Sequence, residues 1–342
     1  TKTCRGGLPG YACFGTSVLD GQNYNYESSA ISSFLKAAEG HDLILLLPHP
    51  TSIEVIRHIT ERARKAIETL DSAKRRAPFL AKWKRWPVKH TRFFPISFEL
   101  ELLAKQEWQE FLKSFNVVEL DYDGVNLKQV MDWYDRSHPP FGKGKKRKEF
   151  PDALAIATIL HYAKTNSTTV AVIAQDTDIG NACDEHPELL HFSTLPQYTE
   201  AILTGLANFN KAKELVMAEA ETIEGQFLDA FCDLDFHLIG GGECDIDGVS
   251  ITAMWSPDAR VVSIGNHECT IAFETQVEFE VRTLWYDEDT GMTGHGGKVS
   301  GCSDVSGLAK VCFSDTWESI DDVTSIQLDQ EYVEVEMYDD TY

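Results

Sequence analysis

The chain has 342 residues, of which 43% are hydrophobic, and its formal net charge is −23. This length exceeds the size at which one hydrophobic core usually keeps growing, so two domains are expected, and the apolar content excludes a disordered chain. No apolar run approaches the roughly 20 residues of a membrane span and no signal segment opens the sequence, which predicts a cytoplasmic protein without membrane contact. The eight cysteines form no Cys-x-x-Cys pair and are expected to be reduced thiols.

Charge is distributed unevenly along the chain. Between Arg57 and Lys148 lie 21 of the 31 lysines and arginines, whereas the segment from Phe231 to Tyr342 carries 24 acidic and four basic residues. Such asymmetry is a hint of nucleic-acid contact on the basic side. The acidic part is a candidate docking surface for a protein partner or a shield over the basic part.

Short apolar runs alternate with helical patterns in the first two thirds of the chain. This order predicts a parallel sheet covered by helices on both faces, in a domain assigned to residues 1–222. Strands are predicted at residues 11–14, 43–48, 116–122 and 168–174, and helices at residues 28–38, 53–70, 99–115 and 125–134 and from Pro151 onward.

After about Ile223 the chain consists of β-branched and aromatic stretches separated by Gly, Asp and Asn turns. In residues 274–281, Val277, Phe279 and Val281 alternate with glutamates. Alternation of this kind predicts a half-exposed antiparallel sheet, in an acidic β domain assigned to residues 223–342.

Four acidic residues follow the predicted strands of the α/β domain. Glu54 comes after the strand ending at Pro48, Asp176 and Asp178 end the strand at 168–174, and Asp152 begins a helix. In an open parallel sheet the strand carboxyl ends form the ligand crevice, so these side chains could converge there. Two carboxylates ~4 Å apart repel by ~4 kcal/mol at an effective dielectric near 20, and oxygen ligands favour Mg²⁺ or Mn²⁺, which would remove that repulsion. Each acid also has an ordinary interpretation as a helix cap or turn residue.

The segment Glu149-Phe150-Pro151-Asp152-Ala153 is the most distinctive part of the chain. It follows Pro139-Pro140-Phe141 and a basic run, and Ala174-Gln175-Asp176-Thr177-Asp178 comes roughly twenty residues later. Together these stretches resemble a bacterial branch of the PIN-domain nucleases, over about residues 11–206. The resemblance implies a three-layer α/β/α fold, a Mg²⁺ or Mn²⁺ site of acidic ligands, and hydrolysis of RNA, sometimes DNA, by metal-activated water. It places the second, third and fourth acids at Glu54, Asp152 and Asp176, with Asp178 as a neighbour or alternative.

The first acid of the family pattern is missing. Gly15 stands where PIN domains have an aspartate after the first strand. An engineered substitution, a natural loss of activity and compensation by Asp20 are the three interpretations. Compensation is the least favoured, because Asp20 lies five residues beyond the strand end. His49 and His58 flank Glu54, but histidines near a helix start are more often surface or packing residues.

Basic residues form two clusters, which suit a path for single-stranded nucleic acid because cations contact phosphates and aromatic rings stack on bases. The first interleaves with Phe79, Trp83, Trp86 and Phe93, and could instead be a solvated helix face. The second directly precedes Asp152. The residues expected to bind nucleic acid are Arg75, Arg76, Lys84 and Arg85 in the first cluster and Lys143, Lys145, Lys146, Arg147 and Lys148 in the second.

These features predict a metal-dependent endoribonuclease that cleaves single-stranded RNA, with Glu54, Asp152 and Asp176 as metal ligands and Asp178 beside them. The family resemblance alone suggests a toxin or antiviral defence effector. Two alternatives remain: a catalytically inactive nucleic-acid-binding module, which Gly15 supports, and a subunit of a larger assembly that docks through its acidic domain.

Overall fold

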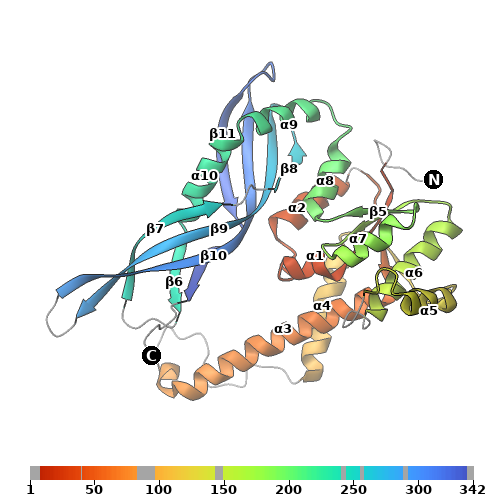
Figure 1. Ribbon diagram of the computed structural model, residues 1–342, viewed down its shortest axis with the longest axis horizontal. Coiled ribbons are helices and arrows are strands. Elements are labelled where there is room, and N and C mark those ends of the chain that lie inside the picture. The colour runs from red at the N-terminus through yellow and green to blue at the C-terminus, as the bar shows by residue number, and fades with distance from the viewer. Residues whose placement is uncertain are drawn as a thin grey trace. The chain divides into compact units, whose positions relative to one another are not determined.

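The computed structural model describes residues 8–39, 41–82, 97–142, 149–239, 244–254, 258–287 and 292–336. It contains two compact units (Figure 1). The first unit comprises Thr1–Tyr26 and Ala38–Tyr198, and the second unit comprises Glu27–Ala37 and Thr199–Tyr342. The predicted domain boundary between residues 222 and 223 stays a prediction, and the second unit includes the chain from Thr199 onward together with a segment near the N-terminus.

A five-stranded parallel sheet forms the centre of the first unit. Its order is β3-β2-β1-β4-β5, so the chain leaves the middle strand β1 in one direction for β2 and β3 and returns on its other side as β4 and β5. The point where the order reverses, between β1 and β4, is where open α/β sheets bind ligands. The strands are β1 (Tyr11–Phe14), β2 (Ile44–Pro48), β3 (Asn116–Leu120), β4 (Val170–Ile173) and β5 (Leu189–Phe192).

Helices cover both faces of this sheet. On one face Cys13, Leu46 and Val172 share a buried core with α5, α6 and α7, and on the other the Phe14 ring lies 6.0 Å from the Phe115 ring just after α4. Side chains alternate between the two faces of each strand, and with both faces covered the central strands β1, β2 and β4 are apolar along their length. The helices of this unit are α1 (Thr16–Gly21), α3 (His49–Arg76), η1 (Pro78–Lys82), α4 (Ser97–Leu112), α5 (Leu127–Arg136), α6 (Phe150–Thr165) and α7 (Thr177–Asp184), and α8 (Leu195–Leu203) begins in it. The expected three-layer α/β/α fold is therefore confirmed.

Local sequence explains where several of these helices begin. A proline lies in the first turn of both α3 and α6, where its missing N–H removes no helical hydrogen bond. Asn126 accepts a hydrogen bond from the Gln129 N–H at the start of α5, and Asp176 accepts one from the Asp178 N–H at the start of α7. These positions place the acidic residues of interest at helix starts beside the carboxyl edge of the sheet.

Antiparallel strands form the main sheet of the second unit, in the order β11-β10-β9-β7, with β8 also paired to β9 (Figure 1). Val277, Phe279 and Val281 of β9 are buried and Glu278 is exposed, as the alternation predicts. The strands are β7 (Cys244–Met254), β8 (Asp258–Ile264), β9 (Glu268–Asp287), β10 (Met292–Phe313) and β11 (Ile320–Leu328). The predicted antiparallel sheet is therefore confirmed, and a separate pair of strands, β6 (Asp235–Ile239) and β12 (Tyr332–Glu336), is parallel.

The second unit also contains helices that the sequence did not assign to a β domain. They are α2 (Ser29–Glu39), α9 (Phe209–Ala218) and α10 (Ala220–Cys232). Phe227 and Phe231 of α10 are buried against the sheet, with ring centroids 5.4 Å from Phe273 and 5.6 Å from Phe279. At the start of α2, the Ser29 hydroxyl donates to Asp329 at 2.8 Å.

Two expectations about the chain's chemistry bear on its class. Among the described residues no helix is both long and apolar enough to cross a membrane. The cysteines that the structure records in the described ranges are free thiols, as expected: Cys13, Cys183, Cys232, Cys269, Cys302 and Cys312.

Candidate functional site

A small cavity opens at the carboxyl edge of the parallel sheet in the first unit. Its volume is about 20 Å³, enough for one water molecule or a bare cation. Gly15 and Thr16 after β1, Thr51 and Glu54 on α3 and Asp152 on α6 line it, and the rest of the wall is mainly apolar. The structure therefore brings Glu54, Asp152 and the Gly15 position together around what we call the acid cavity.

Glu54 lies in the second turn of α3, because that helix begins at His49. Glu54 therefore does not lie in a first helical turn, where the helix dipole would favour an acid, and that ordinary interpretation of Glu54 is wrong. Its carboxylate accepts hydrogen bonds from the Thr16 hydroxyl at 3.3 Å and from the Arg57 guanidinium at 3.2 Å. The His58 Nε2 atom lies 3.8 Å from the same carboxylate.

Asp152 lies in the first turn of α6, directly after Pro151. Burial, which is the larger cause, and the negative charges of four neighbouring carboxylates together raise the pKa of its carboxyl to about 7. Both causes disfavour the ionised form, since a charge in a poorly hydrated cavity is costly and like charges repel. The four neighbours are Glu54, Glu149, Asp176 and Asp178.

Asp176 and Asp178 follow β4 and start α7. The Asp176 side chain accepts a hydrogen bond from the Asp178 N–H at 2.7 Å, so Asp176 does act as a helix cap. Neither residue lines the acid cavity, although the charge of each raises the pKa of Asp152. Both carboxylates thus lie near the cavity and outside its wall.

Gly15 has an extended backbone, with φ −70° and ψ 152°, and its N–H donates to the Ile173 carbonyl at 2.7 Å. A Cβ atom at this position would lie 2.9 Å from the Cβ of Ala174, closer than van der Waals contact allows. The backbone angles would suit any residue. An aspartate here therefore requires β1 or β4 to shift by a few tenths of an ångström.

Asp20 and the two histidines are placed outside the wall of the acid cavity. The Asp20 carboxylate pairs with Arg62 at 2.8 Å, which does not favour its acting in place of a first acid. The His58 Nδ1 atom lies 3.0 Å from the Tyr24 hydroxyl, and the His49 ring packs edge-on against Tyr122.

Thr16 contacts Glu54 and Tyr24 contacts His58, and the sequence did not indicate either contact. Thr16 lines the cavity and binds Glu54, and Tyr24 positions His58. Only the place of Thr16, immediately after the first strand and next to Gly15, could have indicated its role.

Oxygen ligands suit a hard divalent cation, and a cation would relieve the repulsion between Asp152 and its neighbouring carboxylates. In the described part of the chain, however, no group of three or more His, Cys, Asp or Glu side chains is already arranged to hold a metal ion. The reason is that Glu54 and Asp176 direct oxygens to Thr16, Arg57 and a backbone N–H. The residues fit a cation in charge and chemistry, and binding would require these side chains to rotate toward the cavity.

Arg75 and Arg76 are exposed at the end of α3. At 1.5 Å per helical residue they lie about 32 Å from Glu54 along the helix axis. Lys84, Arg85 and the run from Lys143 to Lys148 fall outside the described residues.

Comparison with known proteins gives one match. Residues 13–179, which include Gly15, Glu54, Asp152 and Asp176, match the family model described as PIN domain. Neither the curated proteins nor the solved structures contain a match to the chain.

Proposed function

Because residues 13–179 belong to the PIN domain family, whose members are generally nucleases, we propose that this chain is a metal-dependent nuclease with its site at the acid cavity. Glu54, Asp152 and Asp176 would be the metal ligands, and Asp178 would support them. The observation that carries the proposal is that Glu54 and Asp152 line one cavity at the carboxyl edge of the sheet, with Asp176 and Asp178 near enough for their charges to add to the effect of burial on the pKa of Asp152.

Each residue has a specific task in this proposal. A Mg²⁺ or Mn²⁺ ion at the cavity would supply the positive charge that orients a water molecule and stabilises a phosphodiester in the transition state. Asp152 provides a buried oxygen ligand, and Thr16 holds the Glu54 carboxylate at the cavity wall. The apolar remainder of the wall keeps bulk water away and strengthens every charge interaction inside.

Single-stranded RNA is the substrate that the proposal favours, and a toxin or antiviral role rests on family analogy alone. The basic run from Lys143 to Lys148 ends four residues before Asp152 in the chain, whereas Arg75 and Arg76 lie about 32 Å from Glu54. The run next to Asp152 would therefore hold phosphates near the cut site, and the α3 pair would contact the substrate at a distance.

A second candidate function is nucleic-acid binding without cleavage. The observation that favours it is that the first carboxylate is absent and that a Cβ atom at Gly15 would lie 2.9 Å from the Cβ of Ala174, too close without a shift of the strands. In that case the acidic second unit would serve as a docking surface for a protein partner, or would compete with nucleic acid for the basic residues.

Mn²⁺ binding to the full chain, measured by calorimetry, tests the site. The variant Asp152→Asn should abolish binding, and the exposed α7 variant Asp184→Asn, which changes a carboxylate away from the cavity wall, should leave it unchanged. Unchanged binding in Asp152→Asn would place the metal elsewhere.

Nucleic-acid contact is tested by removing two charges at a time. Arg75→Gln with Arg76→Gln, and Arg147→Gln with Lys148→Gln, should each lower the salt dependence of single-stranded RNA binding by about 1.4 in the log–log slope. The pair Lys298→Gln with Lys310→Gln removes two cations already paired with glutamates of the second unit and should leave the slope unchanged. Equal slopes in all variants would contradict contact of the nucleic acid with either basic cluster.

A further inference from the structure

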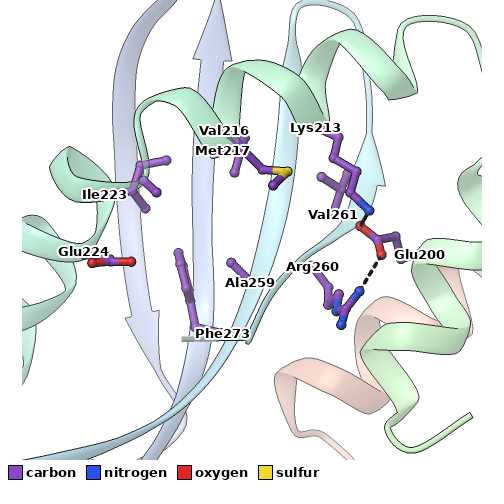
Figure 2. Close-up of a pocket in the computed structure, with 11 residues that line it drawn as sticks. Glu200, Lys213, Val216, Met217, Ile223, Glu224, Ala259, Arg260, Val261 and Phe273 are labelled. Carbon is purple, nitrogen blue, oxygen red and sulfur yellow. Dashed lines mark hydrogen bonds and ion pairs between the residues drawn. The ribbon is translucent and has the colours of Figure 1, made fainter. Parts of the chain in front are cut away.

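The second unit contains a larger cavity of a different kind, between α9 and α10 on one side and β8 and β9 on the other (Figure 2). Its volume is about 360 Å³, within the range of sites that bind small organic molecules. Most of its wall is apolar, and we call it the amphipathic cavity. The apolar lining residues are Val216, Met217, Ala220, Ile223, Ala259, Val261 and Phe273.

Charged groups gather at one end of this cavity. Glu200, whose side chain is only 7% exposed, pairs with Lys213 of α9 at 3.0 Å and with Arg260 of β8 at 3.1 Å. Two cations thus meet the Glu200 carboxylate at this end of the cavity. Glu224 lies at the opposite end (Figure 2).

The ion pairs serve two purposes in this arrangement. They compensate the charge of the Glu200 carboxylate, whose burial would otherwise cost free energy. They also fix the two cations beside the apolar wall of the cavity. A cation beside apolar surface is less screened by water and attracts an anion more strongly than one on an open surface. These two cations lie close together in a part of the chain that is otherwise strongly acidic.

From this combination we infer that the amphipathic cavity binds a small apolar molecule with a single negative charge, of the monocarboxylic acid class. The apolar body would lie between Met217 and Phe273, and its carboxylate would contact Lys213 and Arg260. A carboxylate would bring one negative charge to the end of the cavity that holds both cations, whereas a phosphate monoester would bring up to two charges and meet more repulsion from Glu200 and Glu224. Met217 is 69% exposed and its flexible thioether can adapt to the ligand.

Two fluorescent probes with nearly the same rings test this inference on the full chain. Anilinonaphthalene sulfonate carries one negative charge, and N-phenylnaphthylamine carries none. The variant Lys213→Met should weaken binding of the anionic probe about tenfold, the effect of losing a hydrogen bond to a charged group, and should leave the neutral probe unchanged. Lys211→Met, on an exposed position of the same helix, is the matched control and should affect neither.

A second variant and a displacement series complete the test. Ala259→Phe fills the cavity from β8 and should weaken both probes. Phenylbutyrate should displace the anionic probe from the wild type at concentrations where phenyl phosphate does not. The inference is overturned if Lys213→Met binds both probes as the wild type does, if Ala259→Phe changes neither, or if phenyl phosphate displaces the probe as well as phenylbutyrate.

Discussion

Each unit of the molecule buries a glutamate or aspartate beside a cavity, and the two units compensate that charge in opposite ways. In the first unit Asp152 is surrounded by other carboxylates, and burial together with their charges raises its pKa to about 7. In the second unit Glu200 is held between Lys213 and Arg260. The first cavity thus gathers several carboxylates with Arg57 beside Glu54, and the second holds its buried carboxylate between two cations.

This difference shows how the charged side chains around a cavity indicate whether it prefers a cation or an anion. Buried charges are normally paired, so carboxylates that repel one another around a buried acid indicate a site that gains a cation. Two cations fixed on one carboxylate beside an apolar cavity indicate the reverse, a site that accepts an anion. The cavity volumes agree with this distinction, since about 20 Å³ suits an ion and about 360 Å³ suits an organic molecule.

The largest effect is expected from adding a carboxylate to the acid cavity. Gly15→Asp alone should change little, because its Cβ would lie 2.9 Å from Ala174 Cβ. Gly15→Asp combined with Ala174→Gly relieves this contact and should raise Mn²⁺-dependent cleavage of single-stranded RNA by several orders of magnitude. Cleavage is measured as the initial rate on a labelled oligonucleotide with Mn²⁺ and with chelator.

Two controls separate charge from packing in that experiment. Ala174→Gly alone should not raise the rate, and Gly15→Asn with Ala174→Gly has the shape of the restored site without its charge. If the asparagine form cleaves as fast as the aspartate form, a fourth carboxylate is not what limits the reaction.

The next effect concerns stability and has opposite signs in the two cavities. In the unfolded chain Asp152 titrates near its ordinary value of 3.8, and in the folded chain at about 7. Between these values the folded state binds more protons, so this residue makes stability fall as pH rises from about 4 to 7, with no further change above. Asp152→Asn should therefore stabilise the protein in chelator at pH 8, by on the order of 3 kcal/mol, and the gain should vanish near pH 4.

Glu200→Gln should do the opposite. It removes the anion between Lys213 and Arg260 and should destabilise the protein by about 2 kcal/mol, because two partly buried cations lose their partner. Urea unfolding of both variants at several pH values measures the pair of effects. A stability loss in Asp152→Asn at pH 8 would show that its carboxylate is not under net repulsion.

The sequence allowed much of the first unit to be predicted, for a physical reason. Its strands are buried on both faces and appear as short apolar runs, and prolines mark the starts of α3 and α6. The acids that follow those strands could be assigned to one site because parallel strands place their carboxyl ends at the same edge of the sheet. Their side-chain directions were not predictable, since whether Asp176 caps α7 or faces the cavity depends on local hydrogen bonds.

The amphipathic cavity could not be predicted from the sequence at all. Glu200, Lys213 and Arg260 come from α8, α9 and β8, and nothing in their spacing links them. The helices α9 and α10 were also not anticipated beside a β sheet.

Whether the acidic part shields the basic residues could be tested by truncating the chain near Leu228. Such a truncation would cut α10 and remove the sheet that covers Ile223 and Phe227.

The smallest effect tests whether the acid cavity is short of positive charge or already partly supplied with it. Arg57 contacts the Glu54 carboxylate at 3.2 Å, but its side chain is 59% exposed, so the pair is worth at most about 1 kcal/mol. If Arg57 competes with a metal ion for Glu54, then Arg57→Gln should tighten Mn²⁺ binding by up to about fivefold in calorimetry. The effect should shrink at high salt, where the exposed pair is screened. Arg62→Gln, which removes a cation from Asp20 instead of Glu54, should leave the Mn²⁺ affinity unchanged. Weaker binding in Arg57→Gln would show that the arginine holds Glu54 in the ligating position, and the first cavity would then share with the second a carboxylate organised by a fixed cation.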